Sequence, residues 1–355
     1  MATNANLTRA NRAKNDEFYT RLTDIEKELK HYRGHFKDKV VLCNCDDPYE
    51  SNFFKYFVLN FNRLGLKQVI ATCYSGSPIA HKEWNLSGKP YKAIIHAVYD
   101  ATGDGGIDLE DVQTLFETGE NTLEELEGDG DFRSPECLAL LEEADIVVTN
   151  PPFSLFREYI AKLIEYNKKF LVIGNMNAVT YKEVFPLLKN NLIWTGYKSF
   201  GGGMNMIYPK EQFDSSKVKK YYVDDRGNYI VNIMGCIWFT NLDIKKRHED
   251  LILVKKYNPE LYPTYDNYDA IDVSRVKDIP YDWDGVMGVP ITFLDKHNPA
   301  QFEILGSDFQ VKDGLFDDII RENWDGKLDR GYIDGKRKYS RIFIRNKHPE
   351  PRSEV

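Results

Sequence analysis

The stretch Asp145-Ile-Val-Val-Thr-Asn-Pro-Pro-Phe153 decides the fold of this chain. Its first five residues form a short run rich in β-branched side chains, which is typical of a buried strand. Residues 155–166 follow at once, and their apolar positions recur at helical spacing. A buried strand joined to an amphipathic helix by a short loop is the repeating part of an α/β sheet, so we expect that fold class.

Strand and helix patterns alternate on both sides of this unit. We expect further strands at residues 39–43, 69–72, 93–98, 170–173 and 192–194, and further helices at 50–63, 135–143 and 181–188. The alternation predicts a doubly wound, mostly parallel, Rossmann-like sheet. Ligands of such sheets bind beyond the carboxyl ends of the strands, so we expect the functional residues directly after them.

The regular alternation ends at about residue 200. Beyond it lie three glycines at 201–203, aromatic strand patterns at 221–229 and 233–239, and a stretch rich in Pro, Tyr and Asp at 257–284. A chain of 355 residues is long enough for one or two domains. We expect a ligand-binding α/β domain over residues 1–199, with an acidic insertion at about 100–134. We expect residues 200–355 to select the substrate, with some of their strands completing the sheet.

The charge distribution is uneven along the chain. The net charge of −8 argues against a nucleic-acid partner, because phosphate contacts normally need a basic surface. Acidic residues are concentrated between residues 100 and 145, whereas residues 327–352 hold nine Lys and Arg against three acidic residues, with aromatic residues between them. Such a basic segment can bind backbone phosphates and stack on bases, or it can be a solvated tail.

Neither export nor membrane insertion is predicted. The first 18 residues contain no apolar stretch, and no apolar run in the chain approaches the roughly 20 residues of a membrane span. The five cysteines lack zinc-finger spacing, which favours free thiols in a reducing compartment and no metal site. We therefore expect a cytoplasmic protein.

The tetrapeptide Asn150-Pro-Pro-Phe153 is the strongest functional signal. The two prolines fix φ and remove backbone donors, so the carbonyl of Pro151 can point into a cleft as a rigid acceptor while Pro152 keeps the turn in place. The amide oxygen of Asn150 supplies a second acceptor, and Phe153 offers a flat face for stacking. Two acceptors and a ring describe a pocket for a planar amine, such as the exocyclic amine of a purine.

Two alternatives to this interpretation stay open at this point. The loop could be a turn that only ends a strand, although the flanking strand and helix make that reading less favoured. A planar-amine pocket also fits protein glutamine or an RNA base. A base inside a duplex could reach the pocket only after being flipped out, at a cost of a few kcal/mol.

At this point the sequence resembles one group, the EcoRI-type adenine-specific DNA methyltransferases. Five blocks carry the resemblance in one order, and together they span most of the chain: residues 15–20 (NDEFYT), 43–53 (CNCDDPYESNF), 128–134 (GDGDFRS), 149–153 (TNPPF), and 288–306 with GVPITF and QFEILG. The resemblance implies a Rossmann-like class I methyltransferase fold and S-adenosylmethionine as methyl donor. It implies direct transfer to the N6 amine of a flipped adenine, with no cysteine nucleophile.

The resemblance also implies which residues hold the donor. They are Phe18, Tyr19, Thr20, Asn44, Cys45, Asp46, Asp47, Asp131, Phe132 and Asn150. The loop after the first strand departs from the common methyltransferase pattern because it lacks Gly-x-Gly. Asp46 and Asp47 could instead cap the helix that follows, and Asp131 could belong to a plain turn.

The resemblance implies double-stranded DNA as the partner, a short palindromic target like GAATTC, and a bacterial, nucleoid-associated location. A cognate restriction endonuclease would act on the same site without a stable complex. Two classes of alternative stay open: a methyltransferase for RNA adenine or a protein amide, and a non-catalytic DNA-binding relative. Candidate phosphate contacts are Lys198, Lys210, Lys219 and Lys220.

Residues 100–111 compete as a calcium loop. Oxygen-bearing side chains stand at loop positions 1, 3, 5, 9 and 12, with Gly105 at position 6. However, residues 93–98 predict a strand where an EF-hand needs a helix, and the last ligand is Asp111 instead of the usual Glu. An acidic turn that starts a helix at Leu109 is the favoured interpretation.

Overall fold

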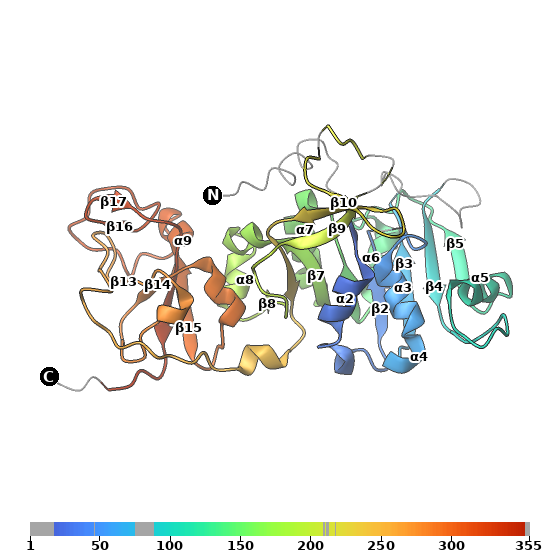
Figure 1. Cartoon of the computed structure of the whole chain (residues 1–355), viewed down its shortest axis with the longest axis horizontal. Coiled ribbons are helices and arrows are strands. Elements are labelled where there is room, and N and C mark those ends of the chain that lie inside the picture. Colours follow the sequence, from blue (N-terminus) through green and yellow to red (C-terminus); the bar gives the residue numbers. More distant parts are fainter. Residues whose placement is uncertain are drawn as a thin grey trace. The chain divides into compact units, whose positions relative to one another are not determined.

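The structure is a computed structural model, and it describes residues 18–45, 47–74, 89–208, 210, 213–216 and 218–351. The chain divides into two compact units, each of which combines two segments (Figure 1). The first unit holds the described residues up to Met176 together with Gly196–Leu242. The second unit holds Asn177–Thr195 and the described residues from Asp243 onward.

The first unit is built on a large mixed sheet with strand order β5-β4-β3-β2-β6-β7-β12. Its centre is parallel and comprises β3 (Gln68–Thr72), β2 (Val40–Cys43), β6 (Ile146–Thr149) and β7 (Lys169–Asn175). Every residue of β2, β3 and β6 is buried, as expected for parallel strands covered on both faces. The strands predicted at 39–43, 69–72, 145–149 and 170–173 are therefore confirmed.

Both flanks of this sheet are antiparallel. β4 (Tyr91–Ile95) pairs with β3 and with β5 (Thr122–Glu125), and β12 (Cys236–Thr240) pairs with β7. Along β4, buried and half-buried residues alternate, the pattern of a strand with one wetter face. The prediction of a mostly parallel sheet is wrong here, because an apolar run reveals a strand but not its direction.

The helices of the first unit follow the predicted pattern closely. They are α2 (Leu22–Leu29), η1 (Arg33–His35), α3 (Asn52–Leu59), α4 (Phe61–Leu64), α5 (Leu109–Glu117), α6 (Pro135–Glu143), η2 (Phe153–Leu155) and α7 (Phe156–Glu165). The helix predicted at 50–63 is divided into α3 and α4 at Asn60, and it ends at Gly65 with φ of 63°. α3 packs on β3, α6 on β2 and α7 on β7.

A smaller antiparallel sheet completes the first unit. Its strand order is β1-β9-β11-β10, with β1 (Tyr19–Thr20), β9 (Met204–Tyr208), β11 (Tyr229–Ile233) and β10 (Tyr222–Val223). Tyr19 pairs with Ile207, so the start of the described chain is held by residues beyond 200. Residues 196–242 thus cluster with the first unit and 177–195 with the second, and β12, from beyond residue 200, pairs with β7 of the large sheet.

The second unit has its own sheet and core. The order of its sheet is β13-β14-β18-β15. Its elements are α8 (Phe185–Lys189), β8 (Trp194–Thr195), η5 (Lys245–His248), β13 (Ile271–Asp272), η6 (Val276–Asp278), β14 (Met287–Val289), η7 (Ile291–Lys296), β15 (Phe302–Ser307), α9 (Asp308–Lys312), β16 (Tyr332–Ile333), β17 (Lys336–Arg337) and β18 (Ile342–Asn346); η3 (Met176–Thr180) lies where the chain passes between the units. α8 and β8 are shorter than the helix predicted at 181–188 and the strand predicted at 192–194.

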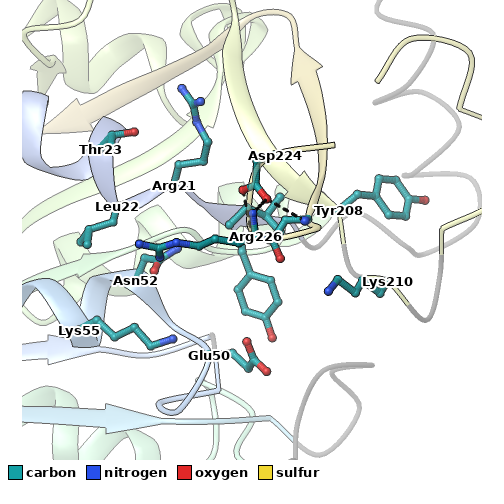
Figure 2. A pocket seen from close by; sticks show the side chains of 13 residues that line it. Arg21, Leu22, Thr23, Glu50, Asn52, Lys55, Tyr208, Lys210, Asp224 and Arg226 are labelled. Atoms are coloured by element: carbon teal, nitrogen blue, oxygen red, sulfur yellow. Dashed lines mark hydrogen bonds between the residues drawn. The ribbon is translucent and has the colours of Figure 1, made fainter. Parts of the chain in front are cut away.

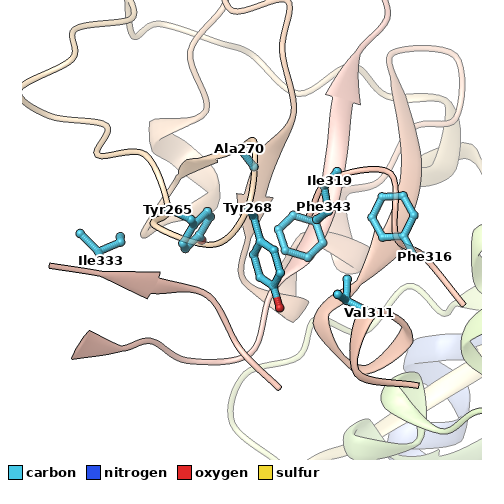
Figure 3. Close-up of a cluster of buried hydrophobic side chains, with 8 residues drawn as sticks. All are labelled: Tyr265, Tyr268, Ala270, Val311, Phe316, Ile319, Ile333 and Phe343. Atoms are coloured by element: carbon cyan, nitrogen blue, oxygen red, sulfur yellow. The ribbon is translucent and has the colours of Figure 1, made fainter. Parts of the chain in front are cut away.

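Aromatic rings fill the core of the second unit (Figure 3). The ring of Tyr268 lies between those of Tyr265 and Phe343, with centroids 5.9 and 5.1 Å away. The Tyr268 hydroxyl donates to the carbonyl of Leu328 at 3.0 Å, so its polar end is satisfied. The stretch rich in Tyr and Asp thus forms a packed core. No helix in the described part of the chain is long and apolar enough to cross a membrane.

Candidate active site

The strand order of the first unit reverses between β2 and β6. These strands are neighbours, but the next parallel strands along the chain, β3 and β7, lie on their opposite outer sides. The connections therefore leave β2 and β6 in opposite directions, and α/β sheets bind their ligands at the carboxyl ends of such a strand pair; we call this edge of the sheet the crevice. At that edge lie Asn44, Cys45 and Asp47 after β2 and residues 150–153 after β6, all of which the sequence singled out.

Hydrogen bonds join the loop at Asn44 to the strand before the Asn150 loop and to the helix after it. The hydroxyl of Thr149 donates to the carbonyl of Asn44. The hydroxyl of Tyr159 on α7 donates to the side-chain oxygen of Asn44 at 2.5 Å. Cys45 has φ of 83°, a conformation that glycine adopts more readily than other residues. The loop thus makes a glycine-like turn although it lacks Gly-x-Gly.

Asn150 is buried and uses only one end of its amide. Its Nδ2 donates to the carbonyl of Phe18 at 2.7 Å. Its Oδ1 is buried and has no hydrogen-bond partner among the described residues. Buried polar atoms in native proteins are nearly always paired, so an orphan acceptor at the edge of a crevice indicates a ligand that donates a hydrogen bond. Neither a capping role nor a core role for Asn150 explains this atom.

The residues after Asn150 hold the loop in one conformation. Pro151 is buried, and Pro152 has φ of −54° and ψ of 125°. The carbonyl of Pro152 accepts from the backbone N–H of Leu155 at 3.0 Å, which starts η2 ahead of α7. Phe153 is buried, with 8% of its surface exposed. The loop is therefore rigid on both sides of its aromatic residue.

The segment of residues 18–20 lies against this loop. Besides its bond to Asn150, Phe18 packs edge-on against the ring of Tyr208, with 5.4 Å between centroids. The carbonyl of Thr20 accepts from the side chain of Asn52, the first residue of α3, at 2.8 Å. Residues 18–20 thus join the Asn150 loop to the helix that follows the Asn44 loop.

Asp47 has a structural role in addition to any contact with a ligand. It is fully buried, and one of its oxygens accepts from the hydroxyl of Tyr91 at 2.8 Å and from the backbone N–H of Tyr49 at 2.9 Å. Burial and the neighbouring Asp47 carboxylate raise the pKa of Tyr91. The N-cap of α3 is Ser51, so the alternative in which Asp47 caps that helix is wrong. Asp46 lies outside the described residues.

Asp131 and Phe132 differ in what they offer the site. The carboxylate of Asp131 binds the guanidinium of Arg133 at 2.6 and 2.8 Å, and this bonding holds the pKa of Asp131 below its ordinary value. The ring of Phe132 packs edge-on against Tyr159, whose hydroxyl binds Asn44. Phe132 is therefore linked to the crevice, whereas the oxygens of Asp131 are engaged by Arg133.

The acidic loop at 100–111 uses its carboxylates to hold its own backbone. Asp100 accepts from the N–H groups of Gly103 and Gly105 at 2.6 and 2.8 Å, and Asp111 accepts from that of Asp108 at 2.8 Å. α5 begins at Leu109 with Asp108 as its N-cap, as predicted, and the strand β4 precedes the loop. Within the described ranges, no group of three or more His, Cys, Asp or Glu side chains could hold a metal ion.

A cavity of about 680 Å³ lies beside residues 18–20 (Figure 2). We call it the basic cavity because Arg21, Lys55, Lys210 and Arg226 line it. The sequence analysis proposed Lys210 as a phosphate contact but missed Lys55 and Arg226. Lys55 is the one cation of the otherwise apolar α3 sequence NFFKYFVL, which was an available signal. Lys198, another proposed contact, donates to the carbonyl oxygens of Ser199 and Gly201.

Comparison with known proteins first establishes the class. Residues 6–347 match the family described as adenine-specific methyltransferase EcoRI. A loop with an unpaired amide acceptor, at the carboxyl ends of β2 and β6 in a mixed sheet, agrees with this class. The chain is an adenine-specific methyltransferase.

Individual relatives then identify the family. The chain is 47% identical over 348 residues to the type II methyltransferase M.EcoRI of Escherichia coli, covering 98% of both chains. It is 37% identical to M.MgeORF184P of Mycoplasma genitalium over 95% of this chain and 97% of that one, and 36% identical to M.MpnI of Mycoplasma pneumoniae over 96% and 97%. The chain belongs to the EcoRI family of adenine-specific type II DNA methyltransferases. No solved structure gives a significant match.

Proposed function

We propose that this enzyme transfers a methyl group from S-adenosylmethionine to the N6 amine of an adenine flipped out of duplex DNA, and that Asn150 and Pro151 hold that amine. The observation that carries the proposal is the buried, unpaired Oδ1 of Asn150 at the crevice between β2 and β6. In this proposal the mixed sheet is a Rossmann-like class I methyltransferase fold.

The proposed role of Asn150 follows from the chemistry of the amine. The lone pair of an exocyclic amine is delocalised into the purine ring, which makes the nitrogen a poor nucleophile. Hydrogen bonds accepted from its two N–H groups favour a more tetrahedral nitrogen and stabilise the positive charge that develops on it. The Oδ1 of Asn150 and the carbonyl of Pro151 are the two acceptors. The bond from Nδ2 to Phe18 fixes the orientation of the amide beforehand.

The residues at the crevice fit the donor. When bound, S-adenosylmethionine supplies a methyl group activated by a sulfonium. Asn44 and Cys45 would hold it through the glycine-like turn, with Phe18, Tyr19, Thr20 and Phe132 around it. The hydroxyl of Thr20 is a second buried polar group with no partner in the described part of the chain, which also suits a polar ligand. Asp47 and Asp131 would act mainly by fixing their turns.

Base flipping is required by the position of the target atom. The N6 amine of a paired adenine lies in the major groove, out of reach of a buried amide, so the nucleotide must leave the stack. Phe153 would stack on the extruded base. Residues beyond about 200, with the basic segment from residue 327, would read the DNA. A restriction endonuclease of the same site would be a functional counterpart, and the enzyme would work in the bacterial cytoplasm.

The test is a pair of substitutions at Asn150. Asn150→Ala removes the acceptor, and we expect turnover to fall by roughly 100- to 1,000-fold or more. Asn150→Asp keeps acceptor oxygens but turns one of them toward the carbonyl of Phe18, so we expect partial activity with lower thermal stability. Turnover is measured with tritiated donor, and donor affinity is measured by calorimetry with S-adenosylhomocysteine.

The controls separate this proposal from the alternatives. Wild-type protein is incubated with tritiated donor and with DNA, RNA or protein separately; label in RNA or protein alone would contradict DNA as the substrate. Donor affinity should change by less than about threefold in Asn150→Ala, because the lost contact is to the amine. Near-normal turnover in that variant would overturn the role of Asn150.

A further inference from the structure

The basic cavity brings cations together from three separate segments of the first unit. Lys55 comes from α3, Lys210 follows β9, and Arg226 lies in the turn between β10 and β11 (Figure 2). Apolar and aromatic side chains, among them Tyr19 and Tyr208, complete its lining. Cations drawn from distant segments into one concave space repel one another, so an anion bound there would be stabilised.

The carboxylates at the cavity do not balance these cations. Asp224 is engaged by its own turn, because its oxygens accept from the N–H groups of Arg226 and Asn228 and from the Asn228 side chain at 2.8 to 3.0 Å. Arg21 is paired with Asp24 at 2.8 Å. Glu50 is the remaining acidic side chain of the lining. Within the described part of the chain, neither Lys55 nor Arg226 forms an ion pair.

The electrostatics of Lys55 favour an anion beside it. Burial lowers the pKa of Lys55, and the like charge of Arg226 lowers it further, against the opposing effects of Glu50 and Asp47. An anion between Lys55 and Arg226 would oppose both effects and raise the pKa of Lys55. Lys55 also lies 5.7 Å from the ring centre of Tyr49, so the flexible end of its side chain is held near the cavity.

The position of the cavity indicates which anion it binds. Tyr19 in its lining adjoins Phe18, whose carbonyl holds Asn150, and Tyr208 packs on the ring of Phe18. The neighbouring β10 strand presents the exposed side chains of Tyr222 and Val223. An exposed approach with aromatic side chains suits a polymer that continues beyond the site, whereas a small donor would be enclosed.

We propose that the basic cavity binds a phosphodiester group of the DNA strand that carries the target adenine, with Lys55 and Arg226 contacting its oxygens. This inference rests on the proposed function, because it needs the adenine to be held at Asn150. The two contacts would act as positioning residues: they fix the backbone on one side of the extruded nucleotide so that its base reaches the Asn150 loop. Lys210, at the Gly227 end of the turn, would contribute long-range attraction.

The test compares Lys55→Gln and Arg226→Gln with Lys67→Gln. Lys67 is exposed and directly precedes β3, at the opposite edge of the sheet from the site. Lys67→Gln therefore removes the same charge at a position away from the cavity. DNA affinity is measured by fluorescence anisotropy over a range of salt, using a duplex with the site found by sequencing modified bases from an expressing host. Donor affinity is measured by calorimetry with S-adenosylhomocysteine.

We expect Lys55→Gln and Arg226→Gln each to weaken DNA binding about tenfold and to reduce the salt slope by about one, while donor affinity stays within twofold. Lys67→Gln should leave both affinities unchanged. A tenfold loss of donor affinity with unchanged DNA binding would assign the cavity to the carboxylate of the donor and overturn the proposal, and so would unchanged DNA binding in both variants.

Two further arms keep the outcome interpretable. Arg226 lies in an exposed turn, so Arg226→Gln should fold even if Lys55→Gln does not, and it then carries the test alone. Wild-type protein is assayed for DNA methylation under the same conditions. Absence of methylation by the wild type would overturn the proposed function and this inference with it, whereas normal wild-type methylation with unaltered DNA binding in the variants overturns only the inference.

Discussion

A Cβ atom on Gly130 would lie 2.0 Å from the carbonyl oxygen of Cys73, closer than any real side chain comes to a backbone atom. Gly130 also has φ of 77°, a region that other residues rarely adopt. The turn before Phe132 can therefore dock on the end of β3 only with glycine at this position. Gly130→Ala should displace the turn and lower the free energy of unfolding by about 1–3 kcal/mol.

The control is Gly128→Ala, the same substitution two residues earlier in the chain. No atom of the described structure would lie within 4 Å of a Cβ on Gly128, so Gly128→Ala should change stability by less than about 0.5 kcal/mol. Because Phe132 moves with the turn, Gly130→Ala should also weaken binding of S-adenosylhomocysteine several-fold. Thermal unfolding and calorimetry measure both effects. Equal behaviour of the two variants would show that the contact with Cys73 has no consequence.

His297 in the second unit should make stability depend on pH. Burial lowers its pKa to about 4, although its ring nitrogen Nε2 donates a hydrogen bond to the Phe302 carbonyl at 3.2 Å. In the unfolded chain a histidine titrates near 6.5, so between about pH 6.5 and 4 the unfolded state binds a proton that the folded state does not. Acidification should therefore destabilise the wild type relative to His297→Gln, measured by unfolding at several pH values.

Asp308 should make the stability of the second unit depend on pH in the opposite direction. Burial raises the pKa of its carboxyl to about 6, against the lowering effects of Arg330 and of hydrogen bonds from Ser340 and Arg341. Between about pH 4 and 6 the folded state holds a proton that the unfolded state has lost, so a rise in pH destabilises the wild type relative to Asp308→Asn. If both variants shift the pH profile in the same direction, at least one of these environments is described wrongly.

The centre of the first unit could be predicted because its signals are local. The apolar runs of β2, β3 and β6 and the helical spacing of α7 each lie within a few residues of sequence. Strand direction and pairing partners are not local properties. Nothing in the residues around Tyr19 shows that this strand pairs with the strand of Ile207. Nothing near residue 200 shows that residues 177–195 belong to the second unit and residues 196–242 to the first.

The same distinction applies to the candidate site. The Asn150 loop could be predicted because two prolines and a flanking strand fix its conformation from within. The unpaired Oδ1 of Asn150 could not be predicted, because the orientation of the amide is set by a hydrogen bond from Nδ2 to Phe18, which is distant in the sequence. Likewise, Lys55 and Arg226 become neighbours only because β1, which contacts α3, also pairs with β9 of the small sheet. Asp47 and Asp131 were singled out by the resemblance as donor-binding residues, but their partners Tyr91 and Arg133 are visible only in three dimensions.

Phe153 and Phe156 offer a way to separate stacking on a base from packing in the core. Both rings are buried, and they are one helical turn apart in the chain. Phe156 packs on Phe239, with 5.0 Å between ring centroids, and it lies close against Gly174, so its surroundings are entirely internal. Phe153 follows directly from the loop that would hold the target amine.

Phe153→Leu keeps an apolar side chain of similar volume but removes the flat face. Stacking on a base contributes about 1–3 kcal/mol, so the specificity constant kcat/KM for DNA should fall roughly 5- to 150-fold, with donor affinity unchanged. Phe156→Leu should instead lower the free energy of unfolding by about 1–2 kcal/mol and leave kcat/KM nearly unchanged at a temperature where the protein is folded. Steady-state methylation and thermal unfolding of both variants measure the contrast. If Phe153→Leu lost only stability, the ring would be a core residue and the extruded adenine would need another stacking partner.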